Sequence, residues 1–63
     1  MTKAIKLYTS SANQGNSDAQ NNLAVCYQNG DGVEEDMNKA IKLYTLSANQ
    51  GNSKAQNNLA VLL

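Results

Sequence analysis

The amino-acid sequence repeats itself with a period of 36 residues, and this feature limits the fold more than any other. Residues 1–27 align with residues 37–63, and the aligned residues differ at Thr2/Asn38, Ser10/Leu46, Asp18/Lys54, Cys26/Leu62 and Tyr27/Leu63. A period of about 20 to 50 residues is typical of a solenoid, in which each unit buries its apolar face against its neighbours. The alternative is a low-complexity tract rich in Asn and Gln. The helical spacing of the apolar residues argues against that alternative.

The segment 36–50 has the apolar spacing of an amphipathic helix. One stripe consists of Met37, Ala40, Ile41, Tyr44 and Ala48, and a flanking row consists of Ala40, Leu43 and Ser47. A helix with two such rows can be covered by two neighbours, as a solenoid requires. Asp36 suits the N-cap, and Gly51 suits the residue after the helix, where glycine adopts a left-handed conformation easily. The counterpart segment, 2–14, ends in the same way at Gly15.

A second kind of helix is predicted at 17–29 and again at 53–62. Ser17 and Gln20 fit the S-x-x-Q capping box of a helix N-terminus, and the same pair recurs at 53 and 56. One face of this helix carries Ala19, Leu23, Cys26 and Tyr27. The Gly-Asn links at 15–16 and 51–52 are short enough to require antiparallel neighbours. We therefore predict an all-α fold with four helices, an α-solenoid fragment of antiparallel helix pairs.

A series of residues between positions 19 and 51 matches the pattern of a known repeat family. They are Ala19-Gln20, Leu23-Ala24, Tyr27, Gly30, Gly32-Val33, Asp36, Ala40, Leu43-Tyr44, Ser47-Ala48 and Gly51. This pattern resembles the Sel-1-like repeat (SLR) family, a relative of the tetratricopeptide repeat. The sequence departs from the family pattern at Ala24, which replaces a glycine, at Leu43, which replaces a tryptophan, and at Ser47, which replaces an alanine.

The resemblance also implies how the chain divides. Residues 1–16 correspond to the second helix of a partial repeat, 17–52 to one complete repeat, and 53–63 to the first helix of a truncated repeat. It implies a two-layer, right-handed superhelical arrangement over residues 1–63.

Charge and composition exclude several classes of protein. Five basic and five acidic residues give a net charge of zero, which argues against a broad electrostatic surface for nucleic acid or anionic lipid. No apolar run is long enough to insert into a membrane, and the first residues lack the pattern of a signal peptide. A single cysteine fits a reducing compartment. We expect a cytoplasmic protein.

Candidate catalytic and metal-binding residues are few. The chain has no histidine, so no imidazole can activate the Cys26 thiol, and we interpret Cys26 as a core residue. The run DGVEED at 31–36 could suggest calcium, but it lacks the twelve-residue loop with a terminal bidentate Glu. We interpret it as a solvated loop with Val33 as its hydrophobic anchor. We expect no enzyme activity, no metal and no cofactor.

Two functions remain open. The resemblance implies a protein-protein interaction scaffold or adaptor that binds a protein or peptide on its concave face. The alternative is a purely structural segment of a longer repeat array, with no partner site of its own. For the scaffold, the predicted binding residues form one polar stripe with a valine in each unit: Asn21, Asn22, Val25, Gln28, Asn57, Asn58 and Val61.

Fewer than two full repeats limit the stability of the fold, because repeat arrays need neighbouring units to bury their apolar faces. We expect a marginal monomer that either frays at both ends or self-associates through its uncapped ends.

Overall fold

Four helices make up the protein in the computed structural model, which describes residues 3–63. They are α1 (Lys3–Asn13), α2 (Ser17–Asn29), α3 (Met37–Asn49) and α4 (Ser53–Leu62). Within the described residues there is no strand, so the prediction of an all-α fold is confirmed. The predicted helix bounds agree with these to within one residue at each end, except that the expected start at Thr2 lies outside the described residues.

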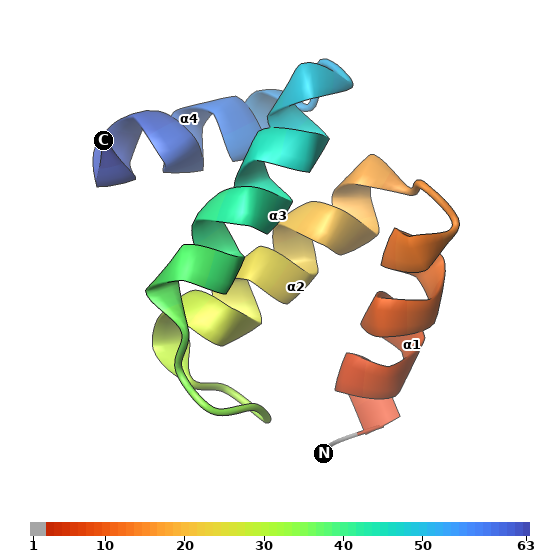
Figure 1. Ribbon diagram of the computed structural model, residues 1–63. Coiled ribbons are helices and arrows are strands. Elements are labelled where there is room, and N and C mark those ends of the chain that lie inside the picture. Colours follow the sequence, from red (N-terminus) through yellow and green to blue (C-terminus); the bar gives the residue numbers. More distant parts are fainter. Residues whose placement is uncertain (1–2) are drawn as a thin grey trace.

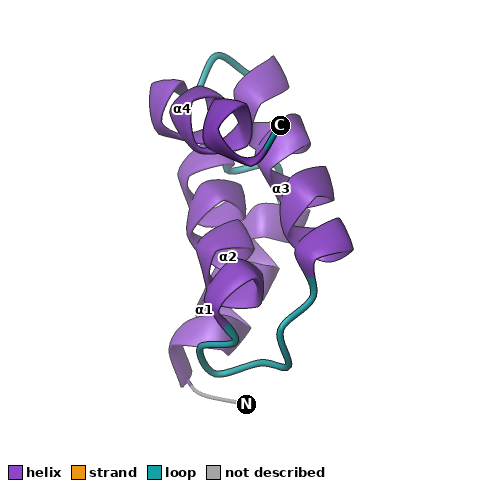
Figure 2. Ribbon diagram, turned by 90° about the vertical axis from the view of Figure 1, so that its left-hand side faces the viewer, coloured by secondary structure: helices purple, strands orange, loops and turns teal. Residues whose placement is uncertain are grey.

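Each helix packs against the next one in the chain, as Figure 1 shows. The two short links, from α1 to α2 and from α3 to α4, lie at one end of the molecule, and the longer α2–α3 loop lies at the other. Figure 2 shows that loop as the extended teal connection below the helices. This arrangement makes consecutive helices antiparallel and places α1 and α4 at opposite ends of the row.

Two buried clusters hold the helices together. The first core cluster, between α1 and α2, consists of Ile5, Ala12, Ala19 and Leu23. The second core cluster, which joins α2, α3 and α4, consists of Ala24, Ala40, Tyr44 and Ala55. Because three of the four residues in the second core cluster are alanines, the helix backbones can approach closely there.

The residues buried on α3 come from both of the predicted rows. Ala40, Tyr44 and Ser47 are buried, whereas Met37 at the start of the predicted stripe is 41% exposed. Deep burial is therefore shared by the two rows, since Tyr44 belongs to the stripe, Ser47 to the flanking row and Ala40 to both. The helix α1 buries Ile5 and Ala12, which are the counterparts of Ile41 and Ala48 in the stripe of α3. Its main neighbour is α2.

The capping residues of α2 and α4 differ from the prediction. The N-caps are Asn16 and Asn52, whose side chains accept hydrogen bonds from the backbone N–H groups of Ala19 and Ala55 at 2.9 Å. Ser17 is the first helical residue, so the predicted capping box is wrong. Asp36 is the N-cap of α3, as predicted, and accepts from the Lys39 N–H.

Glycine ends both helices that precede the short links. Gly15 and Gly51 have φ values of +89° and +88°, as the sequence predicts. Gly51 N–H donates to the Ala48 carbonyl, and the next N–H donates to the Ser47 carbonyl. These two bonds form a Schellman motif, which satisfies the last carbonyls of α3 and turns the chain directly into α4.

Replacing this glycine tests the left-handed conformation. A Cβ at position 51 would meet nothing within 4 Å, so the expected cost of Gly51→Val comes from backbone strain and not from a clash. We expect Gly51→Val to lower the free energy of unfolding by about 1–2 kcal/mol. Chemical denaturation measures this, and Gly51→Asn should cost less, because Asn tolerates the left-handed region better. Equal midpoints for Gly51→Val and the parent would contradict this.

Gln20 connects three helices through its buried side chain. Its amide Nε2 donates to the Ala12 carbonyl at the end of α1 at 3.1 Å. Its Oε1 accepts from Gln50 Nε2, just after α3, at 2.6 Å. Gln56 makes the first of these contacts again, to the Ala48 carbonyl, but Gln56 is exposed.

The two glutamines form a matched pair for mutation. We expect Gln20→Ala to cost about 1–3 kcal/mol of unfolding free energy, because it removes a buried amide together with its hydrogen bonds to the Ala12 carbonyl and to Gln50. Gln56→Ala removes one exposed bond and should cost about 0.5 kcal/mol or less. Denaturant titration of both variants measures the difference. Equal losses would show that the burial of Gln20 does not matter.

Candidate functional site

The predicted binding stripe lies on α2 and α4, which occupy equivalent positions in the repeated sequence. Its members differ widely in exposure. Asn21 is buried, Val25, Gln28 and Asn58 are half-buried, and Asn22, Asn57 and Val61 are exposed.

Asn21 is covered because α4 lies next to α2. Asn58 Nδ2 donates a hydrogen bond to Asn21 Oδ1 at 3.1 Å, and Asn21 is 5% exposed. This bond joins the two stripes side by side. It also commits the Asn21 side chain to the fold, so Asn21 is the member of the stripe least available to a partner.

Gln28 is held by the neighbouring α3. Its Oε1 accepts a hydrogen bond from the Tyr44 hydroxyl at 2.6 Å. Val25 packs against the second core cluster while remaining partly accessible. The side chains that remain most accessible on this surface are therefore Asn22, Asn57 and Val61.

Asp18 and Asn52 form a contact that the sequence analysis missed. Asn52 Nδ2 donates to Asp18 Oδ1 at 2.8 Å, so the residue that caps α4 also binds the first turn of α2. Both are polar residues at helix starts, and sequence alone indicated only their local roles. Lys54, the counterpart of Asp18, is exposed.

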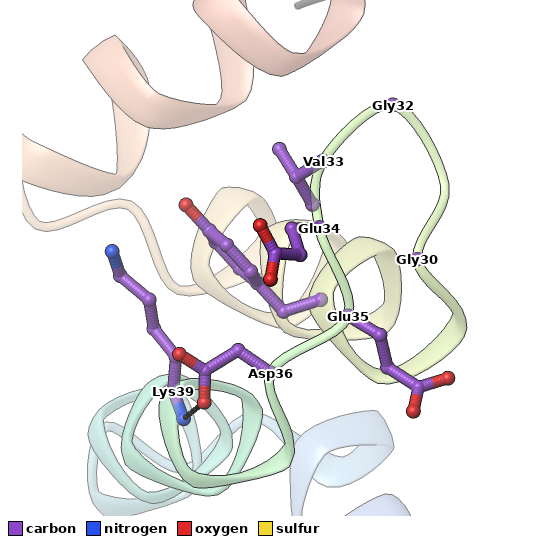
Figure 3. Close-up of a pocket in the computed structure, with 8 residues that line it drawn as sticks. Gly30, Gly32, Val33, Glu34, Glu35, Asp36 and Lys39 are labelled. Carbon is purple, nitrogen blue, oxygen red and sulfur yellow. Dashed lines mark hydrogen bonds between the residues drawn. The ribbon is translucent and has the colours of Figure 1, made fainter.

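A cleft of about 830 Å³ lies between the end of α2 and the start of α3 (Figure 3). The acidic residues of its rim are Glu34, Glu35 and Asp36, all of them exposed. Lys39 Nζ lies 5.0 Å from the centre of the Tyr27 ring, a cation–π contact inside the cleft. Within residues 3–63, no group of three or more acidic, cysteine or histidine residues is arranged to hold a metal ion.

Val33 attaches this loop to the helices. Its side chain is half-buried and packs against the first core cluster. The prediction of Val33 as the hydrophobic anchor of the loop is confirmed. The carboxylates beside it remain in solvent, which agrees with the interpretation of a solvated acidic loop.

Cys26 also packs against the first core cluster. Its thiol pKa is raised above the ordinary value, mainly by burial and further by the Asp31 carboxylate. A raised pKa keeps the thiol protonated at neutral pH, and the thiolate is the nucleophilic form. The structure therefore supports a packing role for Cys26.

Thiol modification kinetics test this environment. Because the folded thiol has the higher pKa, its thiolate fraction at pH 8 is below that of the unfolded chain. We expect iodoacetamide to alkylate native Cys26 several-fold more slowly than the same residue in urea. The native rate should rise as the pH increases. Equal rates in the two states at pH 8 would contradict the burial of Cys26.

The four antiparallel helices, the repeated contacts and the small-residue packing define a helical-repeat protein. The Sel1 repeat family matches the chain over residues 1–16 and 17–52, and the chain belongs to this family. No curated protein and no solved structure matches the chain. Sel1 repeats form a non-enzymatic scaffold and generally mediate protein–protein interaction. None of the helices between residues 3 and 63 is both long and apolar enough to cross a membrane.

Proposed function

We propose that this chain is a protein-interaction scaffold that binds an extended peptide segment across α2 and α4. The observation that carries the proposal is the Asn21–Asn58 hydrogen bond, which joins the two equivalent stripes into one surface. Peptide groups need both donors and acceptors, and the amide side chains of this surface supply both.

The chemistry of the surface indicates the kind of peptide. Val25 and Val61 offer apolar contacts at equivalent places, and Asn22 and Asn57 offer exposed amides. Two charged residues occupy equivalent places at the start of α2 and α4. The carboxylate of Asp18 is bonded to Asn52, whereas Lys54 is exposed and available to a partner. A peptide with an apolar residue and a carboxylate nearer to Lys54 fits this arrangement.

A peptide selection tests the proposal. A displayed library of linear peptides is panned against the chain at a concentration where sedimentation shows it to be monomeric. The affinity of a selected peptide is then measured for the double variant Asn22→Ala, Val61→Ser. We expect a loss of about thirtyfold, since the two lost contacts contribute about 1 kcal/mol each. Both positions are exposed, so the helix content should stay unchanged.

The control variant carries Asn38→Ala and Lys42→Ala on α3, where both residues are exposed and lie outside the proposed surface. It should bind as the parent does. Undiminished affinity in the double variant, or an equal loss in the control, would place binding elsewhere and end the proposal.

A further inference from the structure

Several large apolar side chains are exposed at positions whose counterparts are covered. Leu7, Val61 and Leu63 are 65%, 85% and 85% exposed. Their counterparts 36 residues away are Leu43, Val25 and Tyr27, and all three pack against the second core cluster. These apolar side chains are therefore exposed because α1 and α4 lie at the ends of the row of helices. Their positions have not changed to polar residue types.

The contact between α2 and α3 shows the same difference. Ala24 of α2 and Ala40 of α3 belong to the second core cluster and are both 0% exposed. Their counterparts, Ala60 of α4 and Ala4 of α1, are both exposed. The faces of α2 and α3 that carry these alanines therefore pack against each other, whereas the equivalent faces of α4 and α1 are exposed. The helices α4 and α1 lie at opposite ends of the molecule (Figure 1).

We infer that copies of this chain associate head to tail, with α4 of one copy packed against α1 of the next as α2 packs against α3. Ala60 of one copy then meets Ala4 of the other, and Leu63 lies beside Leu7 of that copy. This contact shares Asn22 and Asn57 with the peptide surface across α2 and α4, but the inference does not depend on the proposed function.

The polar contacts of the α2–α3 contact can be reproduced by identical residue types. In the α2–α3 contact, Ser47 Oγ donates to the Ser17 carbonyl at 2.7 Å, and Gln50 Nε2 donates to Gln20 Oε1 at 2.6 Å. Moved by one repeat, these bonds join Ser11 to the Ser53 carbonyl and Gln14 to Gln56. Gln56 already has the same bond to α3 that Gln20 has to α1, which orients its amide in the same way.

In the copy that contributes α1 to the contact, the helix α2 can also pack against the incoming α4. A cleft of about 290 Å³ lies between α1 and α2, with Ala4, Tyr8 and Asn22 among its lining residues. By the same shift of one repeat, the Asn58–Asn21 bond becomes a bond from Asn22 of the receiving copy to Asn57. The α4 helix therefore meets both walls of this cleft.

A second copy is the occupant because it carries the residues that the open face of α4 needs. The α1 positions that match the α2-facing side of α3 are Ala4, Leu7, Tyr8, Ser11 and Gln14, each identical to its α3 counterpart. The net charge of zero leaves no overall repulsion between copies. Such a heterologous contact does not close by itself in pairs, so it extends into a chain or a ring.

One contact is not reproduced. Asn52 Nδ2 donates to Asp18 Oδ1 within the chain, but the corresponding amide of Asn16 would meet Lys54. Two donors then face each other. The contact between copies is therefore weaker than the α2–α3 contact, and Lys54→Asp should restore the missing bond.

Sedimentation over a range of concentrations tests the inference. The parent chain should show a mass that rises beyond that of a dimer as concentration increases. Ala60→Arg blocks one end and Ala4→Arg blocks the other, so each variant alone should be limited to monomer. Mixed in equal amounts, the two variants should form a one-to-one dimer, because each still has the end that the other lacks.

The controls separate this from other kinds of association. Asn38→Arg adds the same charge at an exposed α3 position outside the contact and should assemble as the parent does. Lys54→Asp should assemble at lower concentration than the parent, yet remain monomeric when combined with Ala4→Arg. That combination distinguishes a stronger contact from a more stable helix. It replaces Ala60→Arg in the test if Ala60→Arg loses its circular-dichroism helix signal, and Lys54→Asp combined with Ala60→Arg replaces Ala4→Arg in the converse case.

A parent chain that stays monomeric at every concentration overturns the inference. So does a mixture of the two arginine variants that stays monomeric while the parent assembles. Assembly of Ala60→Arg alone, or weaker assembly of Lys54→Asp, would show that copies meet through another face.

Discussion

The buried amide of Gln20 is the interaction on which the arrangement of the helices depends. It bonds the end of α1 on one side and Gln50, after α3, on the other, so the positions of both neighbours are set by one α2 side chain. A buried amide requires both its donor and its acceptor to be satisfied. Any sliding of α1 or α3 along α2 would break one of these bonds, and the alanine contacts of the second core cluster then fix the distance between helices.

The helices were predictable because their signals are local. Apolar spacing sets where each helix runs, and Gly15 and Gly51 set where two of them end. The N-cap of α2 was not predictable in this way, because Asn16 and Ser17 are adjacent and both residue types are good N-caps. The choice depends on the Schellman turn that precedes them and on Gln20, whose amide is used by α1 and α3 and so cannot complete a capping box.

The predicted binding stripe shows the same limit for contacts between residues far apart in the sequence. Periodicity correctly put its members on α2 and α4, but it could not tell which of them would be covered. Asn21 is buried because Asn58 of α4, which is 37 residues further along the chain, bonds to it. Gln28 accepts a hydrogen bond from the hydroxyl of Tyr44 on α3. Both contacts depend on how helices cross, which is decided by packing and not by local sequence. The contacts decide which of the predicted residues remain accessible.

The two helices in the middle of the row, α2 and α3, pack against a helix on each side, whereas α1 packs mainly against α2 and α4 mainly against α3. Local opening in a repeat protein costs the contacts that it breaks, so backbone amides should exchange with solvent on a graded scale along the row. We expect the amides of Ala24 and Ala40 to exchange most slowly, because both residues are fully buried between α2 and α3. Opening α1 removes Ile5 and Ala12 from the first core cluster, and opening α4 removes Ala55 from the second, so the two ends open at the expense of different contacts.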